Sequence, residues 1–236
     1  MTQLLVRRIF LREVPASTLR ATALISLLVV AGSTLMSFPL WIVALIGLMP
    51  WFPLIYSEVI WQYRHYGLYA LLSALTLLQL GHVGEHVTQL LQLFFTNGNL
   101  AHSKGVFGAL NIEVVHVIWT VGIWLGIAML LGKFSENRWL WVAFIVASVH
   151  AVEHLFLFSV YAFDHSYYLA GGINGILGKG GLLSFVLDRP YLHFGYNLIE
   201  VIPLVLAYWD QTQKIYEAAW PLSSPTTTRN PQVANL

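Results

Sequence analysis

Residues 81–89 read Gly81-His82-Val83-Gly84-Glu85-His86-Val87-Thr88-Gln89 and lie inside a long apolar run. On a helix, residues three, four and seven apart share a face, so the polar side chains of this stretch form one stripe on an otherwise apolar helix. The same His-x-x-Glu-His spacing returns at residues 150–154. Ionisable groups are costly inside a membrane helix and mark functional sites, so these two His-Glu boxes indicate the centre of the fold.

The composition around the boxes is that of a membrane protein. Of the 236 residues, 57% are hydrophobic and only 10% are charged, whereas soluble domains carry about 25% charged residues. Several apolar runs approach the length that spans a bilayer as a helix. The sequence therefore predicts an all-α, polytopic membrane helix bundle in the lipid bilayer. A formal net charge of +1 does not indicate a nucleic-acid partner.

About six transmembrane helices are expected, separated by turns and loops that contain Gly, Pro or charged residues. Pro50 and Pro53 should kink the second helix. The expected spans are residues 21–36, 40–62, 68–95, 110–131, 139–163 and 190–209. The domain organisation is then a basic amphipathic segment on the cytoplasmic surface, the transmembrane bundle, and a polar, disordered cytoplasmic tail. These three parts are residues 1–20, 21–209 and 210–236.

The placement of Lys and Arg predicts the orientation of this multi-pass protein. Of the 12 basic residues, only Lys104, Lys179 and Arg189 lie on the side opposite the chain ends. Cytoplasmic loops carry the excess of positive charge, so both termini are expected in the cytoplasm.

The order of motifs along the chain predicts an internal repeat. Each His-Glu box is followed by an outer loop, a Lys-Gly pair, and a further histidine five residues after Asn111 or Asp188. Spans three and four would thus form one helical hairpin and spans five and six its duplicate. Both copies would cross the membrane in the same sense.

Two further polar stripes face the boxes, one on the fourth span and one on the sixth. At a rise of 1.5 Å per residue, the box residues His86 and His154 lie about 12–14 Å from the outer ends of their helices. The polar residues of the other two spans lie about 5–15 Å deep on the same count. The middle of these spans contains no Lys or Arg. The carboxylates should therefore be paired with histidine or with a divalent metal.

These stripes contain six histidines and four glutamates, which we take as candidate metal ligands. Such residues on facing helices are typical of carboxylate-bridged metal pairs in helix bundles. The chain contains no cysteine, which excludes thiolate ligands. Imidazole with carboxylate suits iron, zinc or manganese, and copper less selectively. The ten candidate ligands are His82, Glu85, His86, Glu113, His116, His150, Glu153, His154, His193 and Glu200, with Gln89, Thr120 and Asn197 as candidate supporting residues.

The spacings His82/His86 and His150/His154 resemble the histidine boxes of membrane fatty-acid desaturases and hydroxylases. The likeness covers two five-residue segments. Glu85 stands where that pattern has a histidine, no His-x-x-His-His occurs, and the expected site faces outward. The chain is therefore not assigned to that family.

The leading hypothesis is a metal-dependent oxidoreductase or hydroxylase with two iron ions, acting on a lipid-like or other apolar substrate. An electron-donor protein would supply this enzyme with electrons. The ligand count motivates this hypothesis, because six His and four Glu exceed what one tetrahedral zinc needs. A zinc-dependent lipid hydrolase is the second enzyme class. A haem protein and a non-catalytic ion- or proton-conducting subunit remain as alternatives, and the sequence identifies no catalytic residue.

Overall fold

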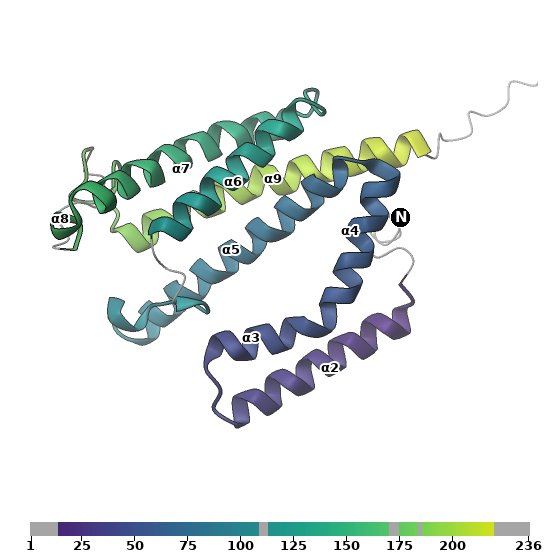
Figure 1. Cartoon of the computed structure of the whole chain (residues 1–236), viewed down its shortest axis with the longest axis horizontal. Helices are drawn as coiled ribbons and strands as arrows, with labels where there is room; N and C mark the ends of the chain where they lie inside the picture. The colour runs from purple at the N-terminus through teal and green to yellow at the C-terminus, as the bar shows by residue number, and fades with distance from the viewer. Residues whose placement is uncertain (1–13, 109–112, 170–174, 184–185, 220–236) are drawn as a thin grey trace, which may run out of the picture.

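The computed structural model describes residues 14–108, 113–169, 175–183 and 186–219, which form helices and no strand (Figure 1). The all-α prediction is therefore confirmed for this part of the chain. The α-helices are α2 (Ala16–Leu35), α3 (Leu40–Leu48), α4 (Phe52–Tyr66), α5 (Tyr69–Phe95), α6 (Glu113–Leu131), α7 (Arg138–Phe163), α8 (His165–Leu169) and α9 (Arg189–Ala219), with 3₁₀ turns at Met49–Trp51 and Leu100–His102.

Four helices are long and apolar enough to cross a membrane, which is compatible with the predicted membrane protein. They are Ala16–Leu35, Leu40–Tyr66, Glu113–Leu131 and Arg138–Phe163. On α2, Leu27 and Leu28 remain 67% and 63% exposed. Large apolar side chains that face outward along a helix of this length are expected where lipid rather than water surrounds it.

The helix boundaries agree closely with the expected spans. The predicted kink in the second span is present, because the 3₁₀ turn Met49–Trp51, which contains Pro50, separates α3 from α4. The two helices run in different directions (Figure 1). The last helix continues past the predicted end at Trp209 to Ala219. The basic segment expected at residues 1–20 falls mostly outside the described residues, as does the tail from residue 220 onward.

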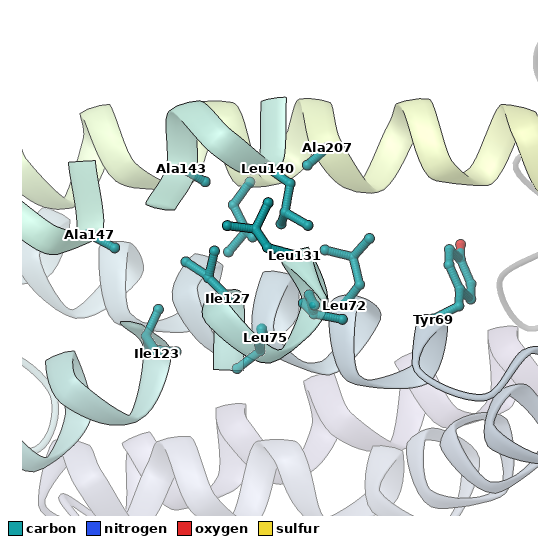
Figure 2. Packing of buried hydrophobic residues seen from close by; sticks show 12 residues of the cluster. Tyr69, Leu72, Leu75, Ile123, Ile127, Leu131, Leu140, Ala143, Ala147 and Ala207 are labelled. Atoms are coloured by element: carbon teal, nitrogen blue, oxygen red, sulfur yellow. The ribbon is translucent and has the colours of Figure 1, made fainter. Parts of the chain in front are cut away.

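Helices α5, α6, α7 and α9 form a bundle in which α6 packs on α7 and α9 packs on both α5 and α7 (Figure 1). One half of the bundle is an apolar core (Figure 2). Ala143 and Ala147 on α7 are fully buried there, and such small side chains let membrane helices approach closely. The other half holds the polar stripes. On each of the four helices, the core residues and the polar residues occupy successive turns, which places the site at one end of a rigid bundle.

Candidate metal centre

Six histidines from α5, α6, α7 and α9 lie together in the polar half of the bundle. The closest of their ring centroids are those of His86 and His193, 4.3 Å apart, and the His82 ring lies 6.5 Å from His193. His116 stacks on His154 with ring centroids 5.3 Å apart. His150 is 1% exposed. The structure therefore brings together all six histidines of the predicted stripes.

The cluster contains two histidine trios that could each hold a metal ion. One trio is His82, His86 and His193, and the other is His150, His154 and His193. Within each trio one ligand atom per residue lies within 4.8 Å of the others. His193 belongs to both trios, so the two candidate metal positions would be neighbours. A neutral imidazole has one lone pair, so His193 would serve both trios at the same time only after losing its ring proton.

The distances between facing ring nitrogens fit ligands of one ion. The Nε2 atoms of His82 and His86 are 3.2 Å apart, and those of His154 and His193 are 3.3 Å apart. Two imidazole nitrogens at 2.0–2.1 Å from a tetrahedral metal are separated by about 3.3 Å. One shared proton can also bridge such a pair, so the nitrogen separation is compatible with either a proton or a metal.

Hydrogen bonds at Nδ1 orient the box histidines. The Nδ1–H of His86 donates to the Oε1 atom of Gln89 at 2.7 Å, and the Nδ1–H of His150 donates to a carboxylate oxygen of Glu200 at 2.6 Å. Since Nδ1 then carries the proton, Nε2 of each ring keeps its lone pair. This arrangement is the one that supporting residues impose on metal-bound histidines. The Nε2 atom of His150 is buried with no hydrogen-bond partner among the described residues, and its lone pair suits a metal ligand.

Among the predicted supporting residues, Gln89 contacts a ring of the cluster and Asn197 contacts the backbone of His193. The side-chain amide of Asn197 donates to the His193 carbonyl at 2.9 Å and accepts from Gln79 at 3.2 Å. Gln79 in turn accepts from the indole of Trp119 at 3.2 Å. Gln79 was missed by the sequence analysis, although it lies three residues before His82 and extends the same stripe.

Glu113 is paired with an arginine, which corrects the expectation that no basic residue reaches these carboxylates. The guanidinium of Arg189, at the start of α9, forms an ion pair with Glu113 Oε1. Tyr168 on α8 donates to the same oxygen at 2.6 Å. Burial raises the pKa of Tyr168, so its phenol keeps this proton. The other oxygen, Oε2, lies 3.6 Å from His154 Nδ1. No local sequence pattern could have predicted these partners, because they come from distant segments.

The carboxylates of the two His-Glu boxes hold the loops that follow α5 and α7. Glu85 accepts hydrogen bonds from the backbone N–H groups of Val106 and Phe107 at 2.9 and 3.0 Å. Glu153 accepts in the same way from Ile176 at 2.9 Å. Both carboxylates are therefore engaged by loop backbone rather than by the histidine rings.

A glycine with positive φ precedes each of these bound loop segments. Gly105 has a φ of 74° and Gly175 a φ of 85°. A Cβ atom on either residue would overlap the carboxylate of Glu85 or Glu153, respectively. The close approach of loop to carboxylate thus requires glycine for two reasons, backbone conformation and space.

Replacing Gly105 or Gly175 with alanine is expected to lower the free energy of unfolding by roughly 3 kcal/mol, because the backbone strain adds to the loss of charge-assisted hydrogen bonds. Gly98→Ala is the matched control, since Gly98 also has positive φ (82°) but open space around a Cβ. It should cost only about 1 kcal/mol. Chemical unfolding in detergent measures all three, and equal losses would contradict the proposed contact.

A cavity of about 470 Å³ adjoins the histidine cluster between α3, α5 and α6. His82, Glu85 and His116 line its wall next to the cluster, and most of the remaining lining is apolar. A second, much smaller cavity of about 10 Å³ is bordered by His154 and His193. That volume is on the order of one water molecule.

Comparisons with protein-family models, curated proteins and solved structures gave no match for this chain. The function is therefore argued from the geometry of the site.

Proposed function

We propose that the chain is an integral membrane oxidoreductase in which five of the six clustered histidines hold a pair of metal ions beside a cavity for an apolar substrate. The observation that carries the proposal is the pair of histidine trios that share His193. Two adjacent sites of imidazole ligands exceed the need of one structural zinc, and imidazole suits iron, zinc and copper. Iron is the metal of this proposal because the proposed reaction is redox chemistry with oxygen.

We assign the ligand role to the histidines and a supporting role to the carboxylates. Glu200 and Glu113 face the Nδ1 sides of His150 and His154, where they orient the rings and raise their basicity. Glu85 and Glu153 order the loops above the site. When bound, the metals would supply redox chemistry with oxygen, while the chain orients the imidazoles and limits the entry of water. The small cavity beside His193 has space for one small molecule.

In the proposed arrangement α5 and α9 also cross the bilayer, giving six spans with both termini in the cytoplasm and the site in the outer half. With 27 and 31 residues they are long enough to do so. The histidines of both helices, with Asn197 and Glu200 of α9, lie at the histidine cluster inside the bundle, where membrane proteins keep such groups. A redox cycle also requires an electron-donor protein.

The duplicated hairpin is supported by the two loop contacts. Glu85 binds the segment after Gly105, and Glu153 binds the segment after Gly175. Gly105 then corresponds to Gly175, rather than to Gly180 as in the comparison of the pairs Lys104-Gly105 and Lys179-Gly180.

A zinc-dependent lipid hydrolase is the second candidate, because each trio alone provides the three protein ligands of a catalytic zinc site. A haem protein is less well supported, since the imidazoles of His86 and His193 contact one another and a macrocycle would have to separate them. Ion or proton conduction would use the same buried groups without bound metal.

The metal content of the detergent-purified protein tests the proposal. We expect about two irons per chain by plasma mass spectrometry after purification without chelators. One zinc per chain would favour the hydrolase. Metal-free protein that also fails to take up iron, zinc or copper would contradict the proposal and leave the histidines as packing or proton-relay groups.

A second measurement tests whether the bound metal is redox-active. Anaerobically reduced protein should consume oxygen, and the double variant His86→Ala/His154→Ala should not, because it removes one ligand from each trio. Oxygen consumption at the wild-type rate in the double variant would contradict the assigned ligands.

A further inference from the structure

The 470 Å³ cavity has the features of a ligand site. Its volume falls in the lower half of the range of about 300–1,000 Å³ found for small-molecule pockets. Ala44 and Leu48 of α3 form one wall, and Leu77 and Leu78 of α5 form another. A half-open apolar cavity of this kind suits a hydrocarbon chain.

The polar part of the lining lies at the histidine cluster. His82 and His116 belong both to the cavity wall and to the six-histidine cluster. Trp119, which also lines the cavity, stacks on His82 with ring centroids 5.1 Å apart. A bound chain would therefore have its apolar part along α3 and α5 and one end against imidazole.

Two glycines on α5 make space for this cavity. Gly81 and Gly84 both line it, and a Cβ atom on either would meet nothing within 4 Å. Glycine inside a helix is unfavourable relative to alanine, so its presence at two positions of one helix calls for a packing or functional reason. Because both positions line the cavity and are open, a larger side chain at either would extend into the cavity.

We propose that this cavity binds a single hydrocarbon chain of a membrane amphiphile and that Gly81 and Gly84 are the residues that determine which chains fit. The proposal deepens the proposed function by naming the substrate class, and it rests on that function only for what happens at the histidines. Binding itself needs no metal. The chain can come from a free fatty acid or from a bilayer phospholipid, which present the same hydrocarbon to the cavity.

Photolabelling of the full-length protein in detergent or vesicles tests this site. The probes are a palmitic acid and a phosphatidylcholine that each carry a diazirine on the acyl chain. We expect cross-links on the α3, α5 and α6 segments that line the cavity. Labelling by the fatty acid alone would identify the free acid as the source, and labelling by the phospholipid alone would identify the bilayer lipid. Wild-type labelling confined to other surfaces would overturn the proposal.

The variants Gly81→Leu and Gly84→Leu fill the cavity from the α5 side. Each should reduce cavity labelling at least about tenfold, because a side chain in an occupied volume is strongly unfavourable for the ligand. Gly122→Leu is the matched control, since Gly122 is a helical glycine on α6 with open space around it and does not line the cavity. It should label like the wild type. Wild-type labelling in both α5 variants would overturn the proposal.

Two further readouts separate this proposal from the proposed function. The Gly81→Leu and Gly84→Leu variants should keep the metal content of the wild type and be at least as thermally stable, since leucine is the better helix former. This result would show that the variants fold and that the histidines are undisturbed. If one of them does not fold, Gly84→Ala with a graded set of chain lengths replaces it, and the longest or bulkiest probes should then be lost first. A metal-free protein that still labels in the cavity would contradict the oxidoreductase but leave this site standing.

Discussion

Replacing His193 with alanine is expected to abolish metal binding at both positions, because this residue belongs to both histidine trios. Loss of a supporting residue near a metal typically costs 10–100-fold in affinity, so loss of a shared ligand should cost at least about 100-fold at each position. Plasma mass spectrometry of the purified variant should find less than one metal per chain. Oxygen consumption by the anaerobically reduced variant should be lost together with the metal.

The controls for His193→Ala distinguish a shared ligand from a general loss of structure. His102→Ala changes an exposed histidine in the outer loop and should keep the wild-type metal content. His82→Ala changes only one trio and should leave about one metal of the expected pair. If His193→Ala retained the full metal content while His82→Ala lost it, the shared role of His193 would be wrong.

Replacing Arg189 with methionine is expected to lower the free energy of unfolding by about 2–3 kcal/mol. Removing one partner of a fully buried ion pair costs about 3–5 kcal/mol, and the 32% exposure of the Arg189 side chain reduces this loss. Glu113 is only 3% exposed. Without the guanidinium its carboxylate would retain a hydrogen bond from Tyr168 but no cation. The double variant Glu113→Leu/Arg189→Met should recover most of this loss, since apolar side chains can replace a buried pair at little cost.

The ion pair of Lys179 with Asp188 provides the matched control. Its side chains are 66% and 61% exposed, and exposed pairs contribute about 0–1 kcal/mol. Lys179→Met should therefore change the stability little. Unfolding in detergent, followed by circular dichroism, gives the free energy of unfolding of the wild type, of the two single variants and of the double variant. A double variant as unstable as Arg189→Met would show that the loss does not come from an unpaired carboxylate.

The Glu113 variants also test the link to the metal site. Glu113 Oε2 lies beside Nδ1 of His154, so the double variant should fold yet bind metal more weakly, by about 10–100-fold. Arg189→Met keeps the carboxylate and should have the smaller effect on metal affinity. Equal metal affinity in the wild type, in Arg189→Met and in the double variant would show that Glu113 does not support the metal site.

The helices could be predicted from the sequence almost to their ends, and so could the meeting of the six histidines. Both follow from local signals. Apolar runs of bilayer length define the helices, and the 3.6-residue period places His82 and His86, or His150 and His154, on one face. Similar depths along four helices then suffice to predict that the rings meet. The end of α9 was missed because the polar residues after Trp209 match the composition of a tail.

The roles of three of the four glutamates could not be predicted, whereas Glu200 pairs with a histidine, His150, as expected. Equal spacing from the histidines made Glu85 and Glu153 look like ligands, but their carboxylates bind loop backbone more than 20 residues away in sequence. Glu113 likewise acquires Arg189 across 76 residues. The helical period predicts which side chains share one face of a helix. It does not predict which groups on distant segments bind each of these side chains.

The sequence by itself determined the all-helical class, the polar stripes and the set of residues from which a metal site could be built. Only the tertiary structure decided that His193 is common to two trios, that Glu200 fixes the proton of His150 on Nδ1, and that a cavity reaches His82. The physical reason is the distance along the chain over which each signal acts. Hydropathy and helical period act within a few turns, whereas each of these contacts depends on how separate helices and loops pack against one another.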